Sequence, residues 1–104
     1  MIEISDVQLN IILDILNRHV PNMKVWAFGS RVNGRVKRYS DLDLVVIGTE
    51  KMSINSLGEL KEAFQESDLP FRVDLLDWNA ISSEFQAVIK EKYEVLKPGF
   101  SDNQ

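Results

Sequence analysis

Residues 25–48 read VWAFGSRVNGRVKRYSDLDLVVIG, in which two short apolar segments flank a polar, basic one. The first apolar run, residues 25–28, stops at a glycine, and the second, residues 42–47, also ends at a glycine. Short runs rich in Val, Leu and aromatic residues are typical of buried strands rather than helices. The pattern therefore predicts two strands joined by a loop over residues 29–40, with room for one helical turn.

The segment before these strands has the signals of one helix. Ser5 and Gln8 form a capping box, and apolar residues then recur at helical spacing. Pro21 cannot continue the helical hydrogen-bond ladder. A helix is therefore predicted from about Asp6 to His19.

Two more helices are predicted in the second half of the chain. Ser56 with Glu59 is interpreted as the capping box of the first, which should end before Pro70. Ser83 with Gln86 is interpreted in the same way for the second. The apolar stripe of this last helix is predicted to be buried and consists of Phe85, Val88 and Ile89.

Strands are predicted between and after these helices. Residues 71–76 alternate apolar and polar side chains, and residues 93–96 are long enough for a short last strand. The order of elements predicts one α/β domain over residues 1–99, in which helices cover a small central sheet. Residues 100–104 are predicted to be a flexible tail.

Composition narrows the class of protein. The chain has 104 residues, of which 44% are hydrophobic and 27% charged, as expected for one globular domain. It has no cysteine, which excludes disulfides, thiolate metal sites and a cysteine nucleophile. The acidic N-terminus does not resemble a signal peptide, and no apolar run approaches the roughly 20 residues of a membrane span. We therefore expect a cytoplasmic protein without membrane contact.

Positive charge is concentrated in the loop between the first two strands. The net charge is −4, so with the loop's four cations set aside the rest of the chain carries −8. An acidic body argues against direct binding to nucleic acid, whereas a basic loop suits a compact polyanion such as a triphosphate. A solvated surface loop is the alternative interpretation of such a run. The four cations are Arg31, Arg35, Lys37 and Arg38.

Three acidic residues lie in or beside otherwise apolar strands. Asp41 and Asp43 project from the same face because side chains alternate along a strand, with Cα atoms roughly 6.5 to 7 Å apart. Carboxylate oxygens are ligands that Mg²⁺ prefers. Asp74 is the third candidate, provided that its strand lies near the first pair. Asp77 stands at a strand end, where a turn or capping acid is common.

Gly29 and Ser30 follow the first strand directly. Glycine allows a ligand to approach the backbone closely, and Ser30 is expected to cap a helical turn whose free N–H groups bind phosphate. The segment is not a P-loop, because Arg35 and Val36 stand where Lys followed by Ser or Thr is required. These residues predict a phosphate-binding turn of another kind.

Together these motifs resemble the DNA polymerase β-like nucleotidyltransferase superfamily, and within it the minimal nucleotidyltransferases. The resemblance lies in WAFGSR (residues 26–31), SDLDL (residues 40–44) and VDLLD (residues 73–77). It implies a mixed sheet flanked by helices, with Mg²⁺ as cofactor and ATP as nucleotide donor.

The resemblance also implies a set of site residues and a partner. Asp41, Asp43 and Asp74 would be the catalytic and metal-binding residues, and Gly29, Ser30 and Arg31 would bind nucleotide phosphates. For Arg31, a plain surface position is the alternative. Minimal nucleotidyltransferases often pair with a HEPN-domain protein as a toxin–antitoxin system, in which AMP is transferred to a tyrosine of the HEPN ribonuclease. A hetero-oligomer with such a toxin is thus expected.

Two other functions fit the same sequence. A non-catalytic antitoxin would neutralise its partner by occlusion, but three acids in hydrophobic strands are costly for a purely structural role. Nucleotidyl transfer to a small molecule shares the chemistry but usually needs a further acceptor-binding domain.

Overall fold

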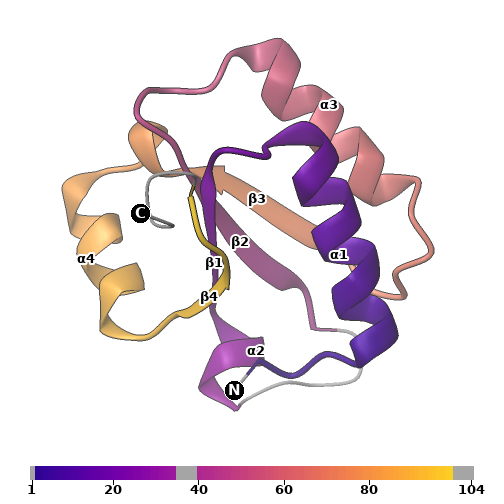
Figure 1. Ribbon diagram of the computed structural model, residues 1–104. Helices are drawn as coiled ribbons and strands as arrows, with labels where there is room; N and C mark the ends of the chain where they lie inside the picture. The colour runs from indigo at the N-terminus through magenta and orange to yellow at the C-terminus, as the bar shows by residue number, and fades with distance from the viewer. Residues whose placement is uncertain (1, 35–39, 100–104) are drawn as a thin grey trace.

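The computed structural model describes residues 2–34 and 40–99 of the chain. In this part, helices surround a four-stranded sheet (Figure 1). Their order is α1 (Asp6–His19), β1 (Lys24–Phe28), α2 (Ser30–Asn33), β2 (Leu42–Ile47), α3 (Ile54–Gln65), β3 (Val73–Asp77), the 3₁₀ helix η1 (Trp78–Ala80), α4 (Ser83–Glu91) and β4 (Glu94–Lys97). The predicted order of elements is confirmed, and α1 and β2 have the predicted bounds.

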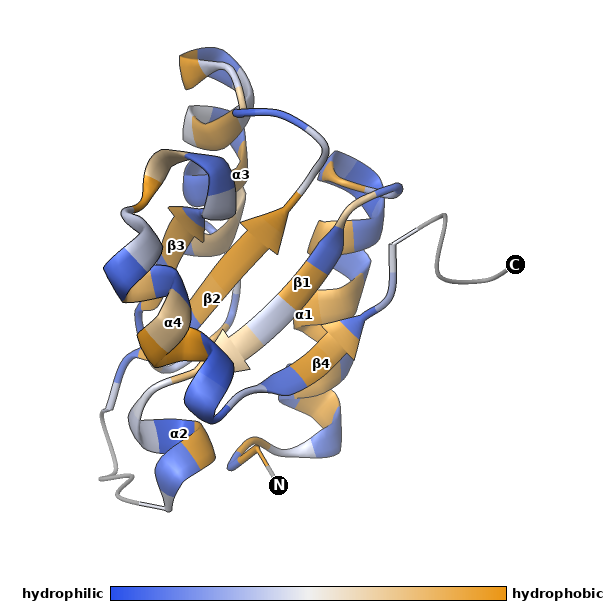
Figure 2. Cartoon of the chain, turned by 90° about the vertical axis from the view of Figure 1, so that its left-hand side faces the viewer, coloured by the Kyte–Doolittle hydropathy of each residue, from blue (hydrophilic) through white to orange (hydrophobic). Residues whose placement is uncertain are grey.

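The sheet is mixed, as the family resemblance implied. Its strand order is β3-β2-β1-β4. β1 pairs antiparallel with both β2 and β4, whereas β2 and β3 are parallel. The parallel pair is possible because α3 provides the long crossover that two parallel strands need. β2 therefore lies inside the sheet, and Figure 2 shows the part of it that leads to the arrowhead as hydrophobic.

The main hydrophobic core lies on one face of the sheet. Helices α1 and α3 pack together against this face, while α4 lies on the other (Figure 1). Alternate strand residues point into the core, so that Val25 and Ala27 of β1 and Leu42 and Leu44 of β2 are fully buried. None of the described helices has the length and apolar character needed to cross a membrane.

The starts of α3 and α4 differ from the prediction. Ser53, not Ser56, is the N-cap of α3, and its side chain accepts a hydrogen bond from the backbone N–H of Ser56. Ser82, not Ser83, caps α4 through the N–H of Phe85. Each segment offers two serines near its helix start, and the chain's path decides which one adopts the extended backbone of a cap.

The predicted buried stripe of α4 is also wrong in part. Ile89 is buried, but Phe85 is 37% exposed and Val88 is 58% exposed. Phe85 contacts the sheet edge-on through Phe28, with ring centroids 6.1 Å apart. α4 therefore covers its face of the sheet incompletely and leaves the β1–β2 end accessible. The predicted tail over residues 100–104 lies outside the described residues.

Candidate active site

Strand pairing brings two of the candidate acids side by side on the face that carries α4. In the sheet register, Phe28 of β1 pairs with Asp43 of β2, and Asp43 pairs with Asp74 of β3. Paired residues point to the same face, which here is the one opposite the main core. Neighbouring strands lie roughly 4.8 Å apart, so the two carboxylates are close neighbours.

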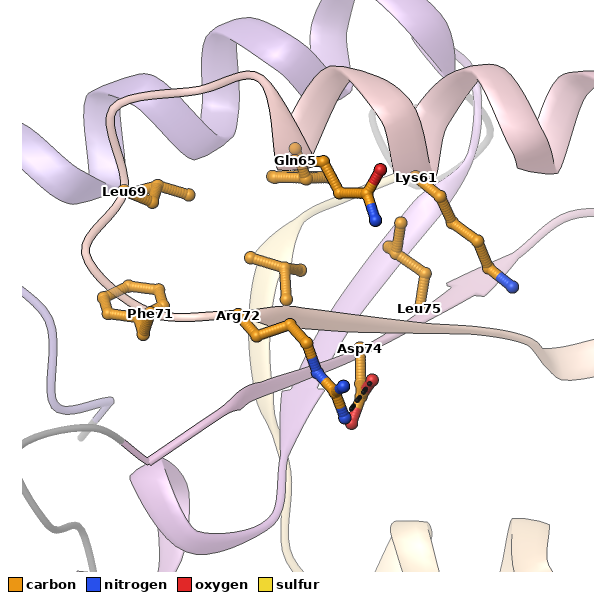
Figure 3. A pocket seen from close by; sticks show the side chains of 9 residues that line it. Lys61, Gln65, Leu69, Phe71, Arg72, Asp74 and Leu75 are labelled. Carbon is orange, nitrogen blue, oxygen red and sulfur yellow. Dashed lines mark ion pairs between the residues drawn. The ribbon is translucent and has the colours of Figure 1, made fainter.

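Asp41 joins this cluster from the loop that leads into β2. The Arg72 guanidinium links it to the third acid, because Nη2 lies 3.3 Å from Asp41 Oδ2 and 3.5 Å from Asp74 Oδ1. Figure 3 shows the pair between Arg72 and Asp74. The backbone supports this link, because Leu42 N–H donates to the carbonyl of Arg72. The structure thus brings together the three acids singled out in the sequence.

Arg72 is a site residue to which the sequence pattern assigned no role. The alternation along residues 71–76 places Arg72 on the same face as Asp74, and this pattern could have predicted its place in the site. Its position between two carboxylates marks the cluster as a place that attracts positive charge.

Asp43 is the most perturbed of the three acids. Partial burial, followed by the charges of Asp74 and Asp41, raises its pKa from 3.8 to about 6, while the Arg72 charge opposes the shift. Crowded carboxylates disfavour one another's charged form, and a bound cation relieves this repulsion. The electrostatics therefore suit a divalent cation.

Gly29 lies directly against Asp43. Its φ of +81° is in the region that favours glycine, and an added Cβ would collide with Asp43 Oδ2 and lie 3.1 Å from Cγ. The position thus admits no side chain. A turn without a side chain leaves backbone N–H groups beside the acids open to a ligand.

The short helix α2 begins at this turn, with one difference from the prediction. Gly29, not Ser30, is its N-cap, and the Gly29 carbonyl accepts from the N–H groups of Val32 and Asn33. Ser30 is the first helical residue, and no side-chain cap bond is formed. The first N–H groups of a helix lack partners within it, so they are oriented to bind an anion.

Arg31 is buried rather than on the surface, with 6% of its area exposed. Its Nε donates to the Ser40 carbonyl at 3.0 Å and its Nη1 to the Glu3 carbonyl at 2.7 Å. The guanidinium also lies 4.1 Å from the ring centre of Phe71. The surface alternative is therefore wrong, and these contacts tie α2 to Ser40, just before β2, and to Glu3 in the N-terminal segment. The other three basic residues of the loop between α2 and β2 lie outside the described residues.

Asp77 has the structural role predicted for it. It is 4% exposed; Oδ1 accepts from Asn79 N–H and Oδ2 from Met52 N–H. These bonds cap η1 and tie it to the loop before α3. With both oxygens engaged away from the cluster, Asp77 is not a member of the candidate site.

The donor set of the site fits Mg²⁺ in chemistry, although it is not a ready-made cage. Over residues 2–34 and 40–99, no three His, Cys, Asp or Glu side chains are placed to hold a metal as they stand. Mg²⁺ is usually held by one or two carboxylates together with substrate phosphates. Asp41 and Asp43, beside the turn at Gly29, fit that requirement in their chemistry.

Asp43 should make stability depend on pH. Its folded pKa of about 6 exceeds the ordinary 3.8, so the stabilising contribution is complete below 3.8 and is lost as the pH rises through 6. Asp43→Asn should abolish this dependence and raise the free energy of unfolding at pH 8 by on the order of 1 kcal/mol, discounted for solvent screening. Urea unfolding at pH 5 and pH 8 in EDTA measures it. The exposed-site variant Asp68→Asn should keep the wild-type dependence of the unfolding free energy on pH. The same dependence in Asp43→Asn would contradict the assignment of this effect to Asp43.

Comparison with known proteins identifies the relatives of this site. Residues 10–98 match the family described as polymerase β, nucleotidyltransferase. The chain is 49% identical over 96 residues to the probable protein adenylyltransferase MntA of Haemophilus influenzae, covering 92% of this chain and 84% of that protein.

Solved structures show the same fold. A toxin–antitoxin crystal structure with AMP-PNP has a chain with 25% identity and a TM-score of 0.75, covering 90% of this chain and 76% of that one. A complex of the tri-AMPylated Shewanella oneidensis HEPN toxin with its MNT antitoxin has a chain with 22% identity and a TM-score of 0.70. That match covers 96% of this chain and 77% of the other.

Proposed function

Because the chain belongs to the polymerase β nucleotidyltransferase family, we propose that it transfers AMP from ATP to a tyrosine of a HEPN-domain ribonuclease and so acts as an antitoxin. The observation that carries the proposal is the alignment of Asp43 and Asp74 across the sheet, with Gly29 packed against Asp43. The acceptor class is supported by the Haemophilus influenzae relative, whose name is probable protein adenylyltransferase.

The residues divide between holding the nucleotide and activating the acceptor. Gly29 and Ser30 bind the β- and γ-phosphates through the first N–H groups of α2 and the serine hydroxyl. Asp74 accepts the proton of the acceptor hydroxyl. The hydroxyl oxygen then bonds to the α-phosphorus as the bond from that phosphorus to the β-phosphate bridging oxygen breaks. AMP remains on the acceptor and pyrophosphate leaves.

Asp41 and Asp43, with Asp74 beside them, would hold Mg²⁺. When bound, this ion neutralises phosphate charge and aligns the triphosphate for displacement. The protein's own contribution is to fix the carboxylates on adjacent strands, so that positioning and electrostatics supply most of the rate.

Arg31 acts indirectly in this proposal. Two of its nitrogens are engaged by backbone carbonyls, which favours a bracing role over direct contact with the leaving group. It would keep α2 and the loop before β2 in the positions that present Gly29 and Asp41.

Catalysis and occlusion predict different stoichiometry with the toxin. If the protein is an enzyme, one-twentieth equivalent with ATP and Mg²⁺ should inactivate a purified HEPN-domain toxin, because each molecule turns over many times. Mass spectrometry of the toxin should then find AMP on tyrosine. A parallel reaction with AMP-PCP in place of ATP should also transfer AMP, because the bond between the α- and β-phosphates of AMP-PCP can still be cleaved. Protection that needs equimolar protein and persists without nucleotide would instead establish occlusion.

A further inference from the structure

A groove follows the outer edge of the sheet beside the acids. This α3–β3 groove has a volume of about 420 Å³ and is lined by Lys61, Phe64, Gln65, Leu69 and residues 71–75 (Figure 3). Building on the proposed function, we propose that it binds an extended segment of the acceptor polypeptide, with the hydroxyl-bearing residue of that segment facing Asp74. Lys61 and Gln65 would then select the acceptor.

The direction of the reaction places the acceptor on this side. In an in-line displacement, the attacking oxygen and the departing pyrophosphate lie on opposite sides of the phosphorus. The order across the sheet is the phosphate-binding turn after β1, Asp43 on β2 and Asp74 on β3. With pyrophosphate at Gly29, the acceptor must approach from beyond β3, and the α3–β3 groove lies there.

The strand at this edge provides the means of binding an extended chain. Among the described residues only β2 pairs with β3, so its other side presents backbone N–H and C=O groups. A polypeptide that adds to such an edge is held by main-chain hydrogen bonds, and its side chains alternate between the two faces. One residue of the bound segment therefore faces Asp74 while its two neighbours face α3.

The two sides of the groove carry different side chains, as the two faces of the bound segment do. Asp74 and Arg72 lie on the acid-bearing side of β3, and Leu75 lies on the side of α3 (Figure 3). On the α3 side, Leu69 and Phe71 offer apolar contact and the exposed Lys61 offers a positive charge. The groove thus fits a segment in which the hydroxyl residue is flanked by an apolar residue and an acidic one.

Filling the groove separates acceptor binding from nucleotide binding. Gln65→Trp should raise the KM for the HEPN-domain acceptor by about tenfold or more, because the indole occupies the space of the incoming chain. Its affinity for AMP-PNP should stay within about twofold of wild type, since the nucleotide lies beyond β2. Glu59→Trp is the matched control, because Glu59 is exposed on the side of α3 near His19 of α1.

Charge reversal tests the selectivity of the same groove. Lys61→Glu should raise the acceptor KM by about fivefold and leave kcat within about twofold, whereas Lys51→Glu, in the loop before α3, should change neither. A photo-crosslinking p-benzoylphenylalanine at position 65 should attach to the acceptor within a few residues of the AMP-bearing tyrosine.

The outcomes distinguish the groove from the proposed function. Absence of AMP transfer to the toxin by the wild-type protein would overturn both. With wild-type transfer intact, an unchanged acceptor KM in Gln65→Trp and Lys61→Glu would overturn the groove alone. Loss of AMP-PNP binding in these variants, or a crosslink remote from the modified tyrosine, would also overturn it.

Discussion

Replacing both Asp41 and Asp43 with Asn should reduce AMP transfer by at least about 10³-fold, roughly 4 kcal/mol of transition-state stabilisation. Asn keeps the shape of each side chain but removes the charge that would hold Mg²⁺ beside the phosphates. The fold should remain intact, because the substitution relieves the repulsion that raises the Asp43 pKa to about 6. Transfer of labelled AMP to the toxin measures activity, and circular dichroism measures folding.

The double variant needs a control with the same change in net charge. Asp14 and Asp68 are exposed and lie away from the cluster, so Asp14→Asn with Asp68→Asn should leave transfer within about twofold. The Asp41→Asn, Asp43→Asn protein should still bind the toxin without inactivating it. Near wild-type transfer by this folded variant in Mg²⁺ would exclude the proposed catalytic site.

Gly29→Ala should also strongly reduce AMP transfer, although it adds only a single methyl group. The new Cβ would collide with Asp43 Oδ2, and the φ of +81° is strained for any residue with a side chain. The carboxylate or the turn must therefore move, and we expect transfer to fall by at least about 10²-fold, since small displacements of positioning groups are costly. Steady-state transfer kinetics test this, with Gly29→Val expected to be worse.

Gly34 offers a matched control for backbone strain. It has a similar φ of +75°, but an added Cβ would meet no atom within 4 Å among the residues that the structure describes. Gly34→Ala therefore carries the strain without the collision and should retain most of the activity. The activity of Ser30→Ala should lie between the activities of Gly29→Ala and Gly34→Ala. Loss of one hydroxyl contact should cost roughly 1 to 3 kcal/mol of transition-state stabilisation. Equal activity of Gly29→Ala and Gly34→Ala would show that the Gly29 turn does not hold the nucleotide.

Local patterns were sufficient to locate the elements and the acids. The capping box at Ser5 gave the start of α1 correctly because the Ser5 and Gln8 side chains bond reciprocally to the backbone within one turn. Alternation along the strands placed Asp43 on the same face as Asp41, and Asp74 on the same face as Arg72, since strand periodicity is a local property. The same reasoning misplaced the starts of α3 and α4, because the serines that match the capping-box pattern, Ser56 and Ser83, lie inside the first turn of each helix, whereas Ser53 and Ser82 cap the helices without a Glu or Gln three residues on.

Burial across the molecule was less accessible from the sequence. Phe85 and Val88 follow helical spacing, yet α4 leaves them partly exposed because only a narrow strip of that helix meets the sheet. Arg31 appeared in a basic, polar loop, and its burial depends on the carbonyl of Glu3, which is distant in the chain. Periodicity reports which residues share a face, but not whether another element covers that face.

Local sequence patterns are enough to predict the α/β class, the strands that carry the acids and the glycine turn, because each follows from side-chain periodicity and backbone preference within a few residues. The three-dimensional fold was needed to establish that β3 lies parallel beside β2, which aligns Asp74 with Asp43. It was also needed to establish that Gly29 packs against Asp43 and that Arg72 lies between two acids. These contacts join residues far apart in the chain, and strand pairing and core packing fix them, neither of which is specified by local periodicity.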